Sequence, residues 1–268
     1  SLLRWMYRGA ARRIRVLPAA SHLVRGRLES AFALPDASVP VTGEPRVDVL
    51  SRGTADDRRV AARAAIARAV PRAGTTSRFV LYAPTWRDGA IDPAVPTAEE
   101  WSRIAEVLRR HDATLLVRSH PLGAGDYAPP FPTDLVHSLG SDLVADVTPL
   151  LPGLDALVTD YSSLAFDASL VPLPTLFLAP DVEEYARRRG FYGTYADVAG
   201  DDWADDWTQA VSQLDAVLGS DDERERRVER AVALDARVHA FRDGRNADRV
   251  YRAILAGTVH AGPREGIG

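Results

Sequence analysis

A pair of hydroxyl side chains stands directly after a short apolar run, in the stretch Thr159-Asp-Tyr-Ser-Ser163. The pattern predicts a buried strand over 156–159, a tight turn and a helix that begins at Ser162-Ser163. The first N–H groups of a helix have no partner within the helix, and the helix dipole attracts negative charge. This arrangement can therefore bind phosphate. Taken alone, such a serine pair serves more often as an ordinary helix N-cap.

Two further loops with polar side chains follow apolar runs that predict strands. Thr85 and Arg87 come after the run 79–83, and His120 comes after the run 114–117. A guanidinium group suits two-point contact with phosphate, and an imidazole can donate a proton to a leaving group. Because the carboxyl ends of parallel strands meet at one edge of a sheet, we expect all three loops at that edge.

Composition and charge exclude several classes of function. The 268 residues are 46% hydrophobic and 26% charged, which is typical of a soluble globular protein with one large or two modest domains. The chain has no cysteine, and all 33 basic residues are arginine, so thiolate and lysine chemistry are both excluded. A net charge of −4 argues against nucleic-acid binding. No acidic cluster has metal-ligand spacing, so we expect no metal and no other cofactor.

The elements that must position these side chains alternate between strand and helix, which predicts a parallel α/β sheet. The expected strands are 79–83, 114–117, 135–136, 155–159 and 174–178, and the expected helices are 21–32, 54–70, 97–110, 202–218, 221–236 and 244–256. A strand at 39–42 is also expected, before a turn at 43–46. Trp203 and Trp207 are expected to be packing residues, and the acidic residues around Asp202 are expected to form a solvated face.

Five motifs stand in order along the chain: Thr42-Gly-Glu-Pro-Arg-Val-Asp48, Tyr82-Ala-Pro-Thr-Trp-Arg87, Arg118-Ser-His-Pro121, Thr159-Asp-Tyr-Ser-Ser163 with Phe166-Asp167, and Asp181 with Tyr185 and Arg189-Gly-Phe-Tyr192. Together they resemble the family of CDP-glycerol glycerophosphotransferases, the enzymes that build teichoic acids. The resemblance implies a GT-B-like Rossmann-type parallel sheet domain with a partial N-terminal Rossmann-like domain and C-terminal helices. Residues 1–50 would be the end of the acceptor-side domain, 51–76 a linker helix region, 77–256 the nucleotide-binding domain and 257–268 a loose tail.

The implied reaction moves glycerol phosphate, or a related polyol phosphate, from CDP-glycerol to a hydroxyl of a polymer on a lipid carrier and releases CMP. His120 would be the catalytic residue, and Thr85, Arg87, Ser162 and Ser163 would bind substrate. The family acts at the inner face of the plasma membrane, so a cytoplasmic, peripheral location is implied.

For the other implied substrate-binding residues, structural roles stay open. Asp160 can orient the histidine or hydrogen-bond its own turn. Tyr185 and Arg189, four residues apart, can frame the cytidine and ribose or form a helix-surface pair. Arg46 can contact phosphate or pair with a nearby acid.

The arginine-rich residues 1–17 have the spacing of a basic amphipathic helix. Such a helix can contact an anionic membrane surface or be an ordinary helix with a solvated arginine face.

One motif of the resembled family, a Trp-His-Gly-type motif whose histidine is the usual candidate for the base, does not occur here. The chain begins with Ser1 in mid-pattern, so we expect it to be part of a longer protein. Two alternatives stay open: a transferase for another CDP-polyol or a nucleotide-sugar, and a non-catalytic nucleotide-binding or scaffold domain of a larger cell-envelope protein.

Overall fold

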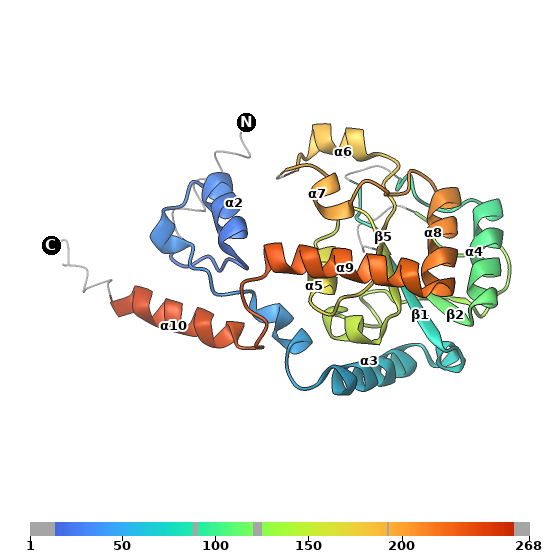
Figure 1. The fold of residues 1–268 in the computed structure, drawn as a ribbon, viewed down its shortest axis with the longest axis horizontal. Helices are drawn as coiled ribbons and strands as arrows, with labels where there is room; N and C mark the ends of the chain where they lie inside the picture. Colours follow the sequence, from blue (N-terminus) through green and yellow to red (C-terminus); the bar gives the residue numbers. More distant parts are fainter. Residues whose placement is uncertain (1–13, 88–90, 120–124, 192, 260–268) are drawn as a thin grey trace. The chain divides into compact units, whose positions relative to one another are not determined.

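The computed structural model describes residues 14–87, 91–119, 125–191 and 193–259 (Figure 1). The chain forms two compact units. The larger unit is Gly53–Leu234, and the smaller one combines Ser1–Arg52 with Asp235–Gly268. Residues 235–256 pack with the N-terminal segment in the smaller unit. No helix among the described residues has the length and apolar character needed to cross a membrane.

The larger unit is built on a five-stranded sheet with the order β3-β2-β1-β4-β5, and every pairing in it is parallel. The strands are β1 (Arg78–Ala83), β2 (Ala113–Val117), β3 (Val136–Ser138), β4 (Ala156–Thr159) and β5 (Thr175–Phe177). Strands β2, β4 and β5 are buried along their whole length, which agrees with their unbroken apolar sequences. The predicted parallel α/β sheet is therefore confirmed.

The direction in which the chain adds strands changes beside β1. It proceeds from β1 to β2 and β3 on one side, and then returns to place β4 and β5 on the other side. The register pairs Ala83, the last residue of β1, with Thr159, the last residue of β4. The loops that follow these two strands therefore start side by side at the topological switch point, where open α/β sheets bind ligands.

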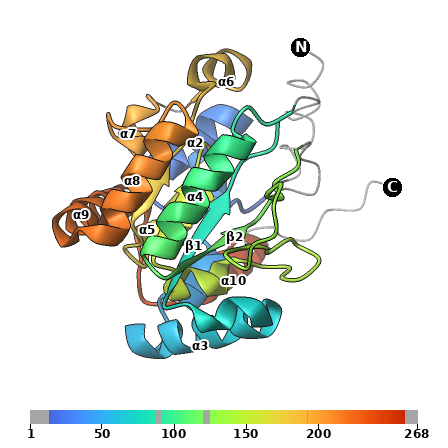
Figure 2. The same cartoon turned by 90° about the vertical axis from the view of Figure 1, so that its right-hand side faces the viewer.

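Helices cover the sheet and close its ends. They are α3 (Ala55–Ala69), α4 (Ala98–Arg110), α5 (Leu164–Ser169), α6 (Val182–Arg188), α7 (Ala196–Ala199), α8 (Trp207–Gly219) and α9 (Asp221–Val238), with 3-10 turns η3 (Pro71–Thr75) and η4 (Thr148–Gly153). Helices α4 and α8 lie side by side and contact β2 and β5 (Figure 2). Helix α3 packs on η4, and α6 lies at the carboxyl end of the sheet (Figure 1).

Two tryptophans pack as the sequence predicts. Trp207 lies in the core between the sheet and α4, and its indole N–H donates to the carbonyl of Ala94 at 2.7 Å. Trp203 packs edge-on against Tyr195, with ring centroids 5.4 Å apart. Both tryptophans anchor the chain that follows β5, so the prediction that they are packing residues is confirmed.

The prediction of a purely solvated face is wrong for Asp202. Its carboxylate lies within 2.6 Å of Arg230, 3.1 Å of Arg226 and 3.1 Å of the buried Arg227. Arg227 also bonds Glu223 at 2.8 Å. Within the larger unit, Asp202 thus links α9 to the segment that follows β5. Sequence spacing could not reveal this role, because the arginines lie 24 or more residues away along the chain.

The smaller unit contains α2 (His22–Phe32), η1 (Asp36–Ser38), η2 (Pro45–Leu50) and α10 (Asn246–Val259). The predicted strand at 39–42 is wrong, since this segment forms only an isolated bridge between Ala19 and Val41. Residues 14–17 are not helical, and the rest of the helix predicted over 1–17 lies outside the described residues. Helix α10 continues beyond the predicted end at 256, into the segment predicted as a loose tail, and 260–268 lie outside the described residues.

The motif Thr42–Asp48 holds the start of α10. The buried carboxylate of Asp48 accepts hydrogen bonds from the backbone N–H groups of Asn246 at 2.8 Å and Ala247 at 3.0 Å. Gly43 has φ +74°, and a Cβ there would lie 2.1 Å from the Asn246 side chain. Only glycine meets both conditions, so part of this motif serves the fold.

Candidate functional site

The loops after β1 and β4 are joined by the carboxylate of Asp160, which is 4% exposed. It accepts the backbone N–H of Thr85 at 2.9 and 3.1 Å and the N–H of Tyr161 at 2.6 Å. The expectation that Asp160 hydrogen-bonds the turn backbone is confirmed, and the bond to Thr85 extends it to the neighbouring loop. We call the two loops, residues 84–87 and 160–163, the motif junction.

Arg87 is a buried residue of this junction. Its Nη1 donates to Asp160 at 2.9 Å and to the Thr85 carbonyl, while Nε and Nη2 donate to Asp181 at 2.7 and 2.9 Å. Four of the five N–H groups of the guanidinium are therefore engaged. Nε and Nη2, the pair of donors that could make a two-point contact with phosphate, are both bonded to Asp181. In this geometry Arg87 therefore holds the two loops and α6 together.

Arg87, Asp160 and Asp181 form a charged cluster in which one guanidinium group contacts two carboxylates. Burial alone would lower the pKa of Arg87, but hydrogen bonds and charge from Asp181 and Asp160 raise it above its ordinary value. Burial would likewise raise the pKa of Asp181, yet hydrogen bonds from Arg87 and Tyr161 hold it below its usual range. For Asp160, burial raises the pKa, and the Arg87 charge and the Thr85 hydrogen bonds offset part of that rise. The cluster therefore offers no net positive charge to a phosphate.

An aromatic cluster of Tyr161, Tyr185, Phe191 and Tyr195 packs beside Arg87. Tyr161 and Tyr185 are stacked, with centroids 3.8 Å apart and planes at 19°, and their rings lie 5.0 and 5.6 Å from the guanidinium carbon. The Tyr161 hydroxyl donates to Asp181 at 2.8 Å, and the Tyr195 hydroxyl donates to the Asp160 carbonyl at 3.1 Å. One face of Tyr185 is thus covered by protein.

The hydroxyl groups of the junction differ in how they are used. Ser162 Oγ accepts the N–H of Leu164 at 3.2 Å, which is a capping role at the start of α5. Ser163 is exposed at the N-cap of α5, where its side chain makes no capping hydrogen bond. Thr85 Oγ1 is buried and has no hydrogen-bond partner among the described residues. A buried hydroxyl without a partner is costly unless a ligand or water completes it.

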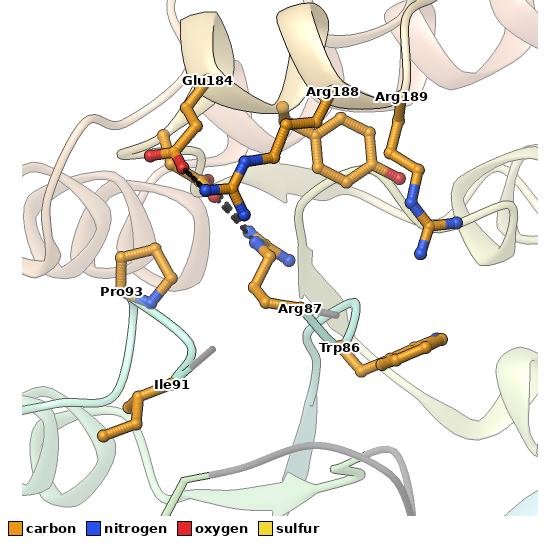
Figure 3. Close-up of a pocket in the computed structure, with 9 residues that line it drawn as sticks. Trp86, Arg87, Ile91, Pro93, Glu184, Arg188 and Arg189 are labelled. Carbon is orange, nitrogen blue, oxygen red and sulfur yellow. Dashed lines mark hydrogen bonds and ion pairs between the residues drawn. The ribbon is translucent and has the colours of Figure 1, made fainter. Parts of the chain in front are cut away.

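A pocket of about 150 Å³ opens next to Arg87, between the loop after β1 and α6 (Figure 3). It brings together three of the predicted substrate-binding residues: Arg87, Tyr185 and Arg189. Its other lining residues are Trp86, Ile91, Pro93, Asp181, Glu184 and Arg188. Trp86 and Arg188 were not among the predicted site residues, although each stands next to one in the sequence. We call this cavity the arginine pocket.

A second pocket, of about 350 Å³, lies at the carboxyl ends of β2 and β3. Tyr127, His137, Ser119 and Ser138 are among its lining residues. Next to it, Arg118 donates to the carbonyls of Leu139, Val144 and Ala145 at 2.8 to 3.1 Å and so holds the loop after β3. Burial lowers the pKa of Arg118. Ser119 belongs to the motif Arg118–Pro121, but none of the pocket's lining residues was a predicted site residue.

Two predicted site residues lie elsewhere. His120 is outside the described residues. Arg46 belongs to the smaller unit, where it bonds Glu44 at 2.9 Å, so its pairing with an acid is confirmed. Across the described residues, no group of His, Asp or Glu could hold a metal ion.

Comparisons with known proteins agree with the motifs. A family model described as CDP-Glycerol:Poly(glycerophosphate) glycerophosphotransferase matches residues 9–256. The chain is 26% identical over 236 residues to the teichoic acid ribitol-phosphate polymerase TarL of Staphylococcus aureus, covering 84% of this chain and 38% of that protein. It is 27% identical over 236 residues to the teichoic acid glycerol-phosphate transferase of the same organism, covering 85% and 57%. The chain therefore spans little more than half of the second relative and less of the first.

Among solved structures, the wall teichoic acid polymerase TagF superposes with a TM-score of 0.75 at 21% identity. The match covers 98% of this chain and 62% of that one. This similarity confirms the expected GT-B-like Rossmann-type fold.

Proposed function

The chain belongs to the CDP-glycerol:poly(glycerophosphate) glycerophosphotransferase family, and we propose that it serves the transfer of a polyol phosphate from a CDP-polyol to a hydroxyl group of a growing polymer, with release of CMP. The relatives it resembles are named for ribitol phosphate and for glycerol phosphate. Glycerol phosphate is the first candidate for the transferred group, and ribitol phosphate is the alternative.

The observation that carries this proposal is the motif junction at the switch point of the sheet. Asp160 bonds the Thr85 amide and Arg87, so two motifs 73 or more residues apart form one rigid edge. A phosphoryl-type transfer depends mainly on holding the donor in line with the attacking hydroxyl and on stabilising charge. A rigid junction at the ligand-binding edge of an α/β sheet supports the first of these requirements.

The donor diphosphate lies at this junction in our proposal. Thr85 Oγ1, which is buried without a partner, and the hydroxyls of Ser162 and Ser163 are its hydrogen-bond donors. Arg87 holds these loops in position. It does not make a two-point contact with the phosphate, since Nε and Nη2 of its guanidinium already donate to Asp181. His120 is the proposed proton donor to the departing CMP oxygen.

The nucleoside of the donor fits the larger pocket at the ends of β2 and β3. Its volume of about 350 Å³ and the Tyr127 ring favour a nucleoside there. The expected cytidine site at Tyr185 is less suitable, because Tyr161 covers one face of that ring at 3.8 Å.

The acceptor is proposed to be a polyol-phosphate polymer on a lipid carrier at the inner face of the plasma membrane. Seven arginines and one acid among residues 1–30 support attraction to an anionic surface. Residues 1–50 are proposed to belong to the acceptor-side domain.

Calorimetry tests the donor assignment. Purified protein is titrated with CDP-glycerol, CDP-ribitol, CMP and UDP-glucose, and we expect both CDP-polyols to bind more tightly than UDP-glucose. Equal or tighter binding of UDP-glucose would overturn the CDP-polyol assignment in favour of a nucleotide-sugar transferase. CMP release from the preferred donor, with a lipid-linked acceptor present, then tests transfer; donor binding without any CMP release would support a non-catalytic nucleotide-binding role.

A further inference from the structure

We propose that the arginine pocket is a subsite for a polyol phosphate, with the phosphate on Arg188 and Arg189 and the carbon chain beside Trp86. The inference deepens the proposed function and rests on it for the identity of the ligand. It assigns Trp86 and Arg188 to substrate binding. Arg189, which the sequence predicts beside the nucleoside, is here proposed to bind the phosphate.

The first argument compares the arginines at the carboxyl edge of the sheet. The guanidinium of Arg87 is bonded to Asp160 and Asp181, and that of Arg118 is bonded to three backbone carbonyls. All of these contacts except the bond from Arg118 to Ala145 are buried or part-buried, so replacing them with contacts to a ligand would destabilise the fold. Both arginines are therefore poorly placed to bind an incoming phosphate.

Arg188, at the end of α6, is held more weakly. Arg188 pairs with Glu184 at 2.7 Å, and the two side chains are 65% and 50% exposed. An ion pair this exposed contributes little stability, so a phosphate can displace or share it. In Figure 3, Arg188 extends from α6 towards Arg87, and Arg189, the C-cap of α6, extends towards Trp86.

The geometry at Trp86 favours a phosphate over a nucleobase. The guanidinium carbon of Arg189 lies 5.6 Å from the centre of the Trp86 ring, so Arg189 covers a face of the indole. A base that stacked on this face would have to displace the arginine. A phosphate can instead bind the edge of the guanidinium while Arg189 stays in place. Ile91, 71% exposed, adds apolar surface for a short carbon chain.

The position of the pocket connects it to the reaction. Arg87 lines the pocket and also bonds Thr85 and Asp160 of the motif junction. A ligand in the pocket therefore lies next to the proposed diphosphate site. Two sources supply the same chemistry there: the polyol phosphate of the donor and the terminal unit of the acceptor polymer.

The test uses three charge-removing variants at the end of α6, Arg188→Gln, Arg189→Gln and, as matched control, Arg187→Gln. Arg187 carries the same charge one residue away, but it pairs with Glu183 at 3.8 Å and does not line the pocket. Binding of CMP, of CDP-glycerol and of a synthetic glycerol-phosphate trimer is measured by calorimetry at fixed salt. Thermal unfolding of each variant is recorded, and we expect no more than a small shift because these side chains are exposed.

We expect Arg188→Gln and Arg189→Gln each to weaken binding of a polyol phosphate by about 10-fold, as for a lost charge-assisted hydrogen bond, while CMP binding and the control stay within about 2-fold of wild type. Loss confined to CDP-glycerol assigns the subsite to the donor, and loss confined to the trimer assigns it to the acceptor. Unchanged binding of both ligands overturns the proposal, and so does an equal loss for CMP. If the wild-type protein binds the trimer in an Arg188-dependent way but does not bind CDP-glycerol, the proposed function fails and the subsite stands.

Discussion

Replacing Arg87 by methionine should destabilise the larger unit strongly. The change leaves the carboxylates of Asp160 and Asp181, which are 4% and 16% exposed, without their positively charged partner. The change removes three charged hydrogen bonds of 2.7 to 2.9 Å while keeping most of the aliphatic stem. Removing one partner of a buried ion pair costs about 3–5 kcal/mol. For a unit of this size, about 1 kcal/mol corresponds to roughly 2–4 °C, so we expect the melting temperature to fall by roughly 6–20 °C.

Urea unfolding followed by tryptophan fluorescence measures this loss. Arg187→Met is the control, since its exposed pair with Glu183 should contribute less than about 1 kcal/mol. Adding Asp181→Asn to Arg87→Met should recover part of the stability, because it removes one of the unpaired charges. Arg87→Lys should stay destabilised, since an ammonium cannot reproduce the two-point contact with Asp181.

A loss below about 1 kcal/mol for Arg87→Met would refute this reasoning. It would mean that the two carboxylates are solvated or protonated at little cost without the arginine. Arg87 would then be available to bind phosphate, as the motif alone suggested. In that case Arg87→Met should weaken binding of CDP far more than binding of cytidine.

Three further outcomes are expected. Burial would raise the pKa of Asp202, but the Arg230 hydrogen bond and the Arg227 charge hold this pKa below its usual value. The ionised Asp202 therefore stabilises the folded protein above about pH 4, and this contribution is lost as the pH falls through the lowered pKa of the folded state. The stability gap between wild type and Asp202→Asn, measured in urea, should shrink below about pH 4, and a constant gap from pH 7 to 3 would contradict this. His120→Ala should weaken CDP binding by about 1.5–3 kcal/mol and leave cytidine binding nearly unchanged in calorimetry; an equal loss for both would indicate a structural histidine. Chelator should leave CDP-glycerol affinity unchanged, and a clear loss would reveal a metal requirement.

Much of the larger unit could be predicted from local sequence. The apolar runs 79–83 and 114–117 became β1 and β2 within a residue, because strands buried on both faces need unbroken apolar sequence. Thr97 and Thr54 marked helix starts correctly, since their hydroxyls cap α4 and α3. The smaller unit was harder to predict. Residues 39–42 have strand composition, yet only Val41 finds a bridge partner there.

The sequence by itself determined that the loops after β1 and β4 start at the same edge of the sheet, because the apolar runs before them form parallel strands. Only the tertiary structure decided how each side chain is used. The motif alone predicts that Arg87 binds phosphate. In the structure its guanidinium instead donates hydrogen bonds to Asp160 and Asp181, which lie 73 and 94 residues away in the sequence. In the sequence, nothing distinguishes Arg188 from the arginines on either side of it. Its position on α6 is what brings it to the pocket. The physical reason is that a charged side chain takes its role from its partners, and long-range partners are set by packing.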